Sequence, residues 1–118
     1  MSKAEGDRGE ALVAQYLRKN GYRILAHSYR CRFGEIDLVA EKDDVISFVE
    51  VKLRSSTAHG LPREFVTYSK QRKLRRTAEC YLAGLGREEK TRFDVAEVYT
   101  DSAHTEATAR IEYLEDAF

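Results

Sequence analysis

Three charged residues lie inside apolar, strand-like runs of the sequence and could do chemistry together. The segment GEIDLVAEKDDVISFVEVK, residues 34–52, carries Asp37 in its first run and Glu50 and Lys52 in its second. A charge buried in such a run must be paired, solvated through a cleft or bound to a metal ion, because an isolated buried charge is strongly unfavourable. These three residues are therefore the first candidates for a functional site.

The two runs are predicted to pair as a hairpin, and the register of that hairpin brings the charges together. With Asp43-Asp44 as the central turn residues, the numbers of opposed residues add up to 87. Asp37 is then opposite Glu50, and Glu35 is opposite Lys52. Side-chain alternation places Asp37, Glu50 and Lys52 on one face. One inserted residue in the turn would change this parity, and a bulge could restore it.

Two carboxylates that face each other repel unless a cation lies between them. Oxygen ligands from one or two carboxylates, with water and phosphate in the remaining positions, are what Mg²⁺ prefers, so Asp37 and Glu50 are predicted ligands of Mg²⁺ or Mn²⁺. Lys52 could orient the attacking water or meet the charge that develops on a phosphoryl group. The alternative is a structural ion pair of Lys52 with Glu50 or Asp37.

The elements that must position these residues follow from periodicity and turn signals. Ser2 and Glu5 form a capping-box pattern, and Gly21 is a helix stop. Gly60 and Pro62 interrupt any regular pattern between residues 55 and 68. We predict a helix over residues 2–20, a strand over 22–29, two hairpin strands within 30–54, a helix over 69–83, a strand over 92–99 and a weaker one over 109–114. The order is αβββαβ, with a possible additional strand.

Length and composition favour one compact domain over residues 1–118, since 118 residues with 42% hydrophobic side chains suffice for one core. The first 20 residues are too charged for a signal peptide, and no apolar run is long enough to span a bilayer, so a cytoplasmic protein without a membrane partner is expected. Cys31 and Cys80 lack metal-binding spacing and are expected to be reduced thiols. No nucleotide-binding glycine motif, zinc-hydrolase histidine pair or serine nucleophile elbow is present.

The net charge is zero, but opposite charges are segregated along the chain. Residues 52–76 hold eight basic side chains and one acid, whereas residues 101–118 hold five acids and one arginine. A polyanion could bind the basic region, because phosphate neutralisation depends on local contacts. The alternative is that the KQRKLRR run, residues 70–76, is only the solvated face of an amphipathic helix.

The motifs GDRGEALVAQYL, GEIDLVA, FVEVKLR, TYSKQRKLRRTAECYL and RFDVAEV, in this order, resemble the YraN family of small bacterial proteins. That family is grouped with the PD-(D/E)XK nuclease-like proteins and is similar to archaeal Holliday junction resolvases. The resemblance implies a restriction-endonuclease-like α/β fold, with an αβββαβ core and a mixed central sheet flanked by two helices. It identifies Asp37, Glu50 and Lys52 with the D…E-x-K positions and Glu10 with an additional helical glutamate. Ile36 precedes Asp37 where the motif's name has a proline.

Glu10 also has support from helical spacing. It shares a stripe with Val13 and Leu17, which must face the sheet because it is the apolar stripe. The alternative is that Glu10 only favours the helix dipole or pairs with a basic residue. Gln71 is likewise expected to point toward the sheet, where it could satisfy backbone groups, and Asp94 is expected to pair with Arg92 or a neighbouring strand residue.

Together these features predict a metal-dependent endonuclease that hydrolyses DNA phosphodiester bonds. Branched or otherwise structured DNA is a possible substrate. Its expected catalytic residues are Glu10, Asp37, Glu50 and Lys52, and its expected phosphate contacts are Arg54, Lys70, Arg72, Lys73 and Arg76. DNA is expected in preference to RNA, and a homodimer is left open. The alternatives are a non-catalytic nucleic-acid-binding module that retains the fold and a protein-interaction domain.

Overall fold

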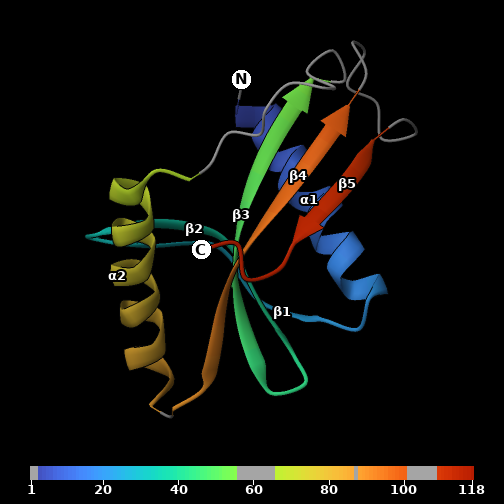
Figure 1. The fold of residues 1–118 in the computed structure, drawn as a ribbon. Helices are drawn as coiled ribbons and strands as arrows, with labels where there is room; N and C mark the ends of the chain where they lie inside the picture. The colour runs from blue at the N-terminus through green and yellow to red at the C-terminus, as the bar shows by residue number, and fades with distance from the viewer. Residues whose placement is uncertain (1–2, 56–65, 87, 101–108) are drawn as a thin grey trace.

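A computed structural model describes residues 3–55, 66–86, 88–100 and 109–118. Two helices and a five-stranded mixed sheet make up these residues, as Figure 1 shows. The strands lie in the order β1-β2-β3-β4-β5, with β3 and β4 parallel and the other neighbours antiparallel. The elements are α1 (Lys3–Lys19), β1 (Arg23–Cys31), β2 (Gly34–Lys42), β3 (Val45–Ser55), α2 (Tyr68–Leu85), β4 (Lys90–Thr100) and β5 (Arg110–Leu114). The predicted α/β class and αβββαβ order are confirmed, and β5 is the additional strand.

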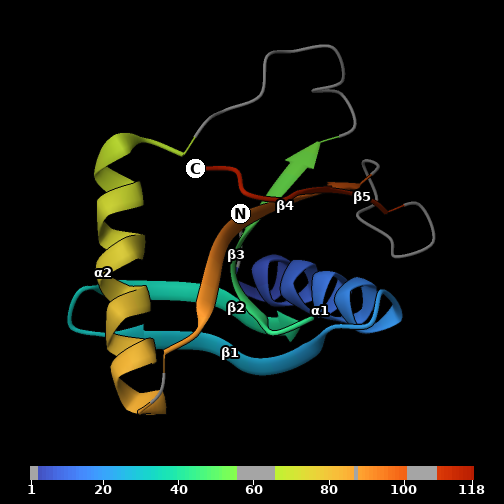
Figure 2. The same ribbon diagram turned by 60° about the horizontal axis from the view of Figure 1, so that its bottom comes forward.

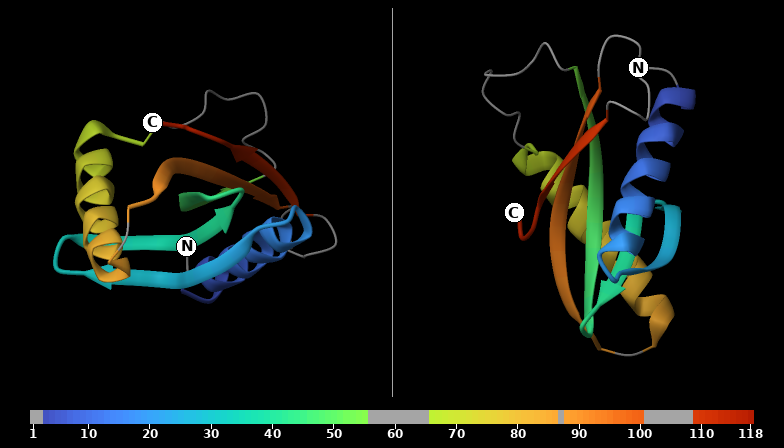
Figure 3. Two further views of the ribbon diagram at one scale, coloured as in Figure 1. Left: turned by 90° about the horizontal axis from the view of Figure 1, so that it is seen from below. Right: turned by 90° about the vertical axis from the view of Figure 1, so that its right-hand side faces the viewer.

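The two helices bury their apolar stripes against different hydrophobic clusters. Helix α1 packs Val13 and Leu17 onto a cluster of β2, β3 and β4 side chains, and Figure 3 shows this helix alongside the sheet. Helix α2 packs Leu74 and Ala78 into a second cluster, with Tyr81 beside it. Figure 2 shows the closed end of the β1–β2 hairpin next to α2, where the Tyr81 ring meets the ring of Tyr29 edge to face at 5.2 Å. The stripe of Val13 and Leu17 predicted from helical spacing is therefore buried.

Local turn chemistry sets the ends of the elements close to their predicted positions. Gly21 has φ +88° after α1, as a left-handed C-terminal stop requires. Asp43 and Asp44 have φ +52° and +63°, which is the backbone of a two-residue type I′ hairpin turn. At the start of α2, the hydroxyl oxygen of Thr67 accepts the N–H of Lys70 at 3.2 Å. The capping-box prediction at Ser2 and most of the predicted loop over 55–68 lie outside the described residues.

The predicted β2–β3 register is correct near the turn and ends before the candidate site. Pairs from Lys42↔Val45 to Leu38↔Val49 have residue numbers that add up to 87. The expected pairs Asp37–Glu50 and Glu35–Lys52 are not part of the ladder. That part of the prediction is wrong, because β2 separates from β3 beyond Leu38.

β2 separates from β3 because the side-chain alternation of β2 breaks at Asp37. Ile36 and Val39 contribute to the same hydrophobic cluster although they are three residues apart, which regular alternation does not allow. In the neighbouring strand, Ser28 has φ +48°, an uncommon conformation for a residue other than glycine. Asp37 accepts the backbone N–H of Val51 with its own carboxylate at 2.7 Å. The break thus leaves Asp37 at the point where β2 and β3 diverge, which we call the β2–β3 fork.

Asp94 is fully buried and lies in an ion-paired network, as expected from the sequence. Its carboxylate accepts hydrogen bonds from Arg92 at 2.8 and 3.0 Å, from the Tyr113 hydroxyl at 2.6 Å and from the Asp116 N–H at 2.9 Å. This network joins β4 to β5 and the following residues, so Asp94 has a structural role.

Two further findings concern the described part of the chain. None of its helices is long and apolar enough to cross a membrane. Cys31 and Cys80 are free thiols, both half-buried.

Candidate functional site

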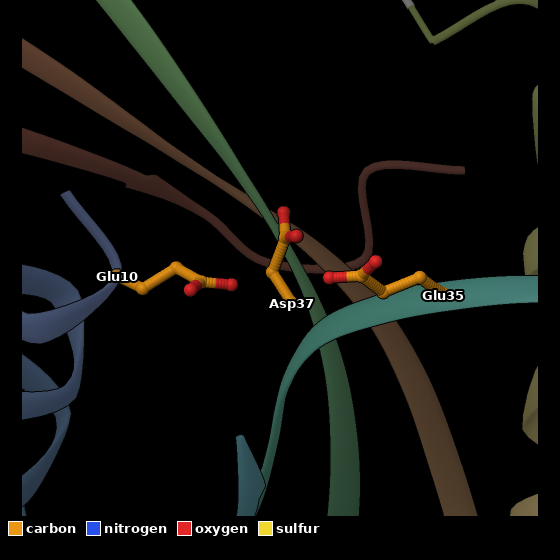
Figure 4. A group of neighbouring side chains, drawn as sticks. All are labelled: Glu10, Glu35 and Asp37. Atoms are coloured by element: carbon orange, nitrogen blue, oxygen red, sulfur yellow. The ribbon is translucent and has the colours of Figure 1, made fainter. Parts of the chain in front are cut away.

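Three carboxylates converge at the fork between β2 and β3. Glu10 extends from α1, and Glu35 and Asp37 extend from β2, so that ligand oxygens of the three lie within 4.8 Å of one another. Figure 4 shows the Glu10 and Glu35 side chains pointing toward Asp37 from opposite sides. Glu10 reaches this position because its stripe partners Val13 and Leu17 are fully buried against the sheet. The sequence-based orientation of Glu10 is therefore confirmed.

The three carboxylates line a cleft of about 530 Å³ that also contains Glu50. Glu50 belongs to β3 and is only 8% exposed. The other residues lining the cleft are Gly6, Asp7, Ser28, Arg30, Val51 and Leu53. Tertiary packing thus brings together Glu10, Asp37 and Glu50, three of the four predicted catalytic residues, and adds Glu35.

Each carboxylate in the cleft has a limited set of protein partners. The Ser28 hydroxyl lies 3.4 Å from both Glu10 oxygens. Arg30 Nε lies 3.0 Å from a Glu35 oxygen, but the Arg30 side chain is 71% exposed, so this contact offsets little of the local negative charge. The Asp37 carboxylate accepts a hydrogen bond from the Val51 N–H. Negative charge at the fork is consequently only partly compensated.

The electrostatic result is clearest at Asp37. Burial is the largest influence on this carboxyl, and the negative charge of Glu50 is the second; together they raise the Asp37 pKa to about 7. Glu10 and Glu35 add to the increase, whereas the Val51 N–H opposes it. Burial, followed by the charge of Glu35, also raises the pKa of Glu10. A bound cation would lower the pKa values of both Asp37 and Glu10, because it favours the ionised carboxylates.

Lys70 enters the site from α2 and forms an ion pair with Glu50. Lys70 Nζ lies 2.6 Å from Glu50 Oε1, with 44% of the Lys70 side chain and 9% of the Glu50 side chain exposed. The sequence predicts Lys70 to be one of the phosphate contacts of this helix. The structure instead directs its side chain to Glu50 of the cleft, which Lys70 can reach from the first turn of α2.

Lys52 does not lie in the position predicted for it. It follows Glu50 by two residues in β3 and is half-buried, but it is not among the described residues that line the cleft. In the described part of the chain, Lys52 forms no ion pair with Asp37 or Glu50. The structural ion pair considered as the alternative role for this motif is therefore not present among these residues.

Glu35 is the member of the site that sequence reasoning missed. The predicted hairpin register makes it only the partner of Lys52. A signal was available, since Glu35 and Asp37 are separated by one residue and strand alternation directs such side chains to the same side. Ser28 gave no such signal, because its approach to Glu10 depends on an unusual backbone angle.

The remaining basic candidates are divided between the surface of α2 and a buried ion pair. Arg72, Lys73 and Arg76 are exposed and, with Ser69, line a shallow hollow of about 220 Å³. Gln71 instead donates from its side-chain amide to the Val66 carbonyl at 2.9 Å, as expected for a residue that points inward. Arg54 lies 3.3 Å from the buried carboxylate of Glu97 on β4.

The fold and the site define an α/β protein with an acidic cleft where its first helix meets the β2–β3 fork. The chain belongs to the uncharacterised protein family UPF0102, the YraN family, which it matches over residues 9–98. A UPF0102 protein of Alkaliphilus metalliredigens is 44% identical over 119 residues, covering 100% of both chains. A UPF0102 protein of Symbiobacterium thermophilum is 50% identical over 99 residues, or 83% of this chain and 84% of that one. The family resemblance inferred from the motifs is confirmed.

Proposed function

We propose that this protein is a metal-dependent nuclease that hydrolyses phosphodiester bonds of DNA, including branched or structured DNA. The observation that carries the proposal is the convergence of Glu10, Asp37 and Glu50 in one cleft, with Glu35 beside them. Chain segments far apart in the sequence supply these carboxylates, at a cost in burial and mutual repulsion that together raise the Asp37 pKa. A binding role for the carboxylates accounts for this arrangement.

The donor set fits a hard divalent cation such as Mg²⁺ or Mn²⁺. All the candidate ligands are carboxylate oxygens, which these ions prefer, and the cleft leaves room for water and a phosphate group. Asp37 and Glu50 would be the principal ligands, and Glu10 and Glu35 would hold ligand waters or a further ion. When bound, the cation would lower the pKa of a coordinated water and neutralise charge on the phosphate.

The chain's own residues have separate tasks in this proposal. The Val51 N–H fixes one oxygen of the Asp37 carboxylate, which lines the cleft. Exposed Arg72, Lys73 and Arg76 would contact backbone phosphates along the surface of α2. Lys52 would orient water only if it moves into the cleft.

A cleavage assay tests the proposal directly. Purified protein is incubated with duplex, single-stranded and four-way-junction DNA, in EDTA and in Mn²⁺. We expect cleavage in Mn²⁺ only, and we expect Asp37→Asn to abolish it. Asp44→Asn is the matched control, since it makes the same chemical change at an exposed position in the β2–β3 turn.

The outcomes separate the proposed nuclease from the other functions. DNA binding that weakens with salt but occurs equally in EDTA, without cleavage, would indicate a non-catalytic binding module. If the protein neither cleaves nor binds DNA, any role of this cleft in nucleic-acid metabolism is refuted. Cleavage that persists in purified Asp37→Asn would show that another site or a contaminant is responsible.

A further inference from the structure

The ion pair between Lys70 and Glu50 is the one cationic contact from α2 to the acidic cleft in the described part of the chain. Glu50 lines the cleft and is close enough to Asp37 to influence its ionisation. With Lys70 Nζ at 2.6 Å, one Glu50 oxygen already has a positive partner. A divalent cation that used Glu50 as a ligand would compete with Lys70 for it.

The two partners differ in their freedom to move. Glu50 is fixed in the interior of the sheet and is almost fully buried, whereas 44% of the Lys70 side chain is exposed. Lysine carries a compact charge on a flexible stem, so its ammonium can change partners while the backbone stays in place. The Lys70 backbone is held by the Thr67 cap. The side chain alone could therefore exchange Glu50 for another anion.

The surface next to Lys70 indicates which anion this would be. Arg72, Lys73 and Arg76 are exposed on the same helix and form a strongly basic surface. A polynucleotide backbone on that surface would bring phosphates near the first turn of α2, where Lys70 lies. A phosphate and Glu50 would then compete for the same ammonium group.

We propose that Lys70 is an internal counter-ion that holds Glu50 until a backbone phosphate takes its place as the partner of Lys70. The cleft then gains its full affinity for a divalent cation only when a nucleic acid is bound. This inference rests on the proposed metal-dependent function and makes Lys70 a positioning residue. Linkage requires the effect to be reciprocal, so bound cation must also strengthen nucleic-acid binding.

Metal affinity without nucleic acid tests the inference. Mn²⁺ is titrated at pH 8 into the parent and Lys70→Gln, and binding is measured by calorimetry and by the electron paramagnetic resonance of free Mn²⁺. Removing the competitor should lower the Mn²⁺ dissociation constant about fivefold to tenfold, at the low end of typical coupling for a partly exposed pair. Lys70→Arg keeps the positive partner of Glu50 and should resemble the parent.

Lys90→Gln is the matched control for the loss of one positive charge. Lys90 is exposed at the start of β4 and pairs across the sheet with Val45, next to the hairpin turn. We expect its Mn²⁺ affinity to equal that of the parent. Thermal unfolding in EDTA checks that all variants are folded.

A second measurement tests the reciprocal effect. The affinity for a labelled duplex is measured by fluorescence anisotropy in EDTA and in Mn²⁺ at equal ionic strength, with intact DNA verified on a gel. The increase caused by Mn²⁺ should be larger in the parent than in Lys70→Gln, because only the parent has the exchangeable lysine.

The possible failures are distinguishable. If the parent binds Mn²⁺ and Lys70→Gln binds it no more tightly, the counter-ion role is refuted while the metal site stands. If Lys90→Gln shows the same increase as Lys70→Gln, the effect is one of overall charge and the inference is also refuted. If neither parent nor variants bind Mn²⁺, both the proposed function and the inference are wrong.

Discussion

Replacing Asp37 by asparagine separates a metal site from a structural role because the two predict opposite changes in stability. The increase in its pKa from 3.8 to about 7 corresponds to on the order of 4 kcal/mol in favour of the protonated carboxyl. Solvent in the cleft screens part of this effect. The asparagine oxygen can still accept the Val51 N–H. We expect Asp37→Asn to increase the free energy of unfolding by about 1–2 kcal/mol at pH 8 without metal.

The pH dependence gives this prediction a definite sign. Asp37 has a higher pKa in the folded protein than its ordinary value of 3.8, so the folded state binds more protons between these two values. The resulting destabilisation is absent below pH 3.8, grows as pH rises to about 7 and is constant above that. The advantage of Asp37→Asn over the parent should follow the same course.

Thermal unfolding followed by circular dichroism measures both stability and metal binding. An increase of 1–2 kcal/mol corresponds to a rise in Tm of about 3–10 °C for a domain of this length. Excess Mn²⁺ should raise the Tm of the parent and of Asp44→Asn, but much less that of Asp37→Asn. If Asp37→Asn is less stable than the parent at pH 8, and Mn²⁺ affects neither, the carboxylate has a structural role and the reasoning is refuted.

Three further predictions concern binding and packing. Lys73→Glu should weaken DNA binding about equally for all sequences and reduce the salt dependence by about one unit, as measured by anisotropy at several salt concentrations; an unchanged slope would indicate a solvated helix face. Asp94→Asn should lower the free energy of unfolding by about 2–4 kcal/mol in urea titrations, because Arg92, whose side chain is 23% exposed, would lose its buried carboxylate partner and keep the exposed Glu115 at 3.6 Å. An unchanged midpoint would contradict the structural role of this network. Gly9→Ala should be less stable than Gly84→Ala by about 1–2 kcal/mol, because a Cβ at Gly9 would lie 2.7 Å from Leu53 whereas one at Gly84 has no heavy atom within 4 Å. Equal melting temperatures of the two alanine variants would show that Leu53 moves aside freely.

Sequence patterns determined the elements of this protein and the direction of its buried faces. The helical stripe of Glu10, Val13 and Leu17 predicted correctly which side of α1 meets the sheet. The turn at Asp43-Asp44 fixed the β2–β3 register from there to Leu38↔Val49. These features depend on contacts within a few residues along the chain or across one tight turn, so composition and spacing suffice to predict them.

The geometry of the site was decided by tertiary structure. Regular alternation predicted a facing pair of Asp37 and Glu50 with Lys52 beside it, but the strands diverge at Asp37 because the β1–β2 ribbon changes direction and carries Ile36 to the cluster under α2. Glu35, which alternation places on the same side of β2 as Asp37, lines the cleft with it. A break of this kind depends on how two hydrophobic layers pack together, which no short segment specifies.

The partner of Glu50 likewise could not be predicted from the sequence. The motif suggested Lys52, its neighbour in the strand, whereas the structure pairs Glu50 with Lys70, which is 20 residues away. The basic run of α2 predicted that positive charge lies near the site, but not which side chain leaves the surface to meet a carboxylate. That selection depends on how close the first turn of α2 comes to Glu50, and thus on the long-range packing of the crossover helix, which lies mainly against β2 and β1.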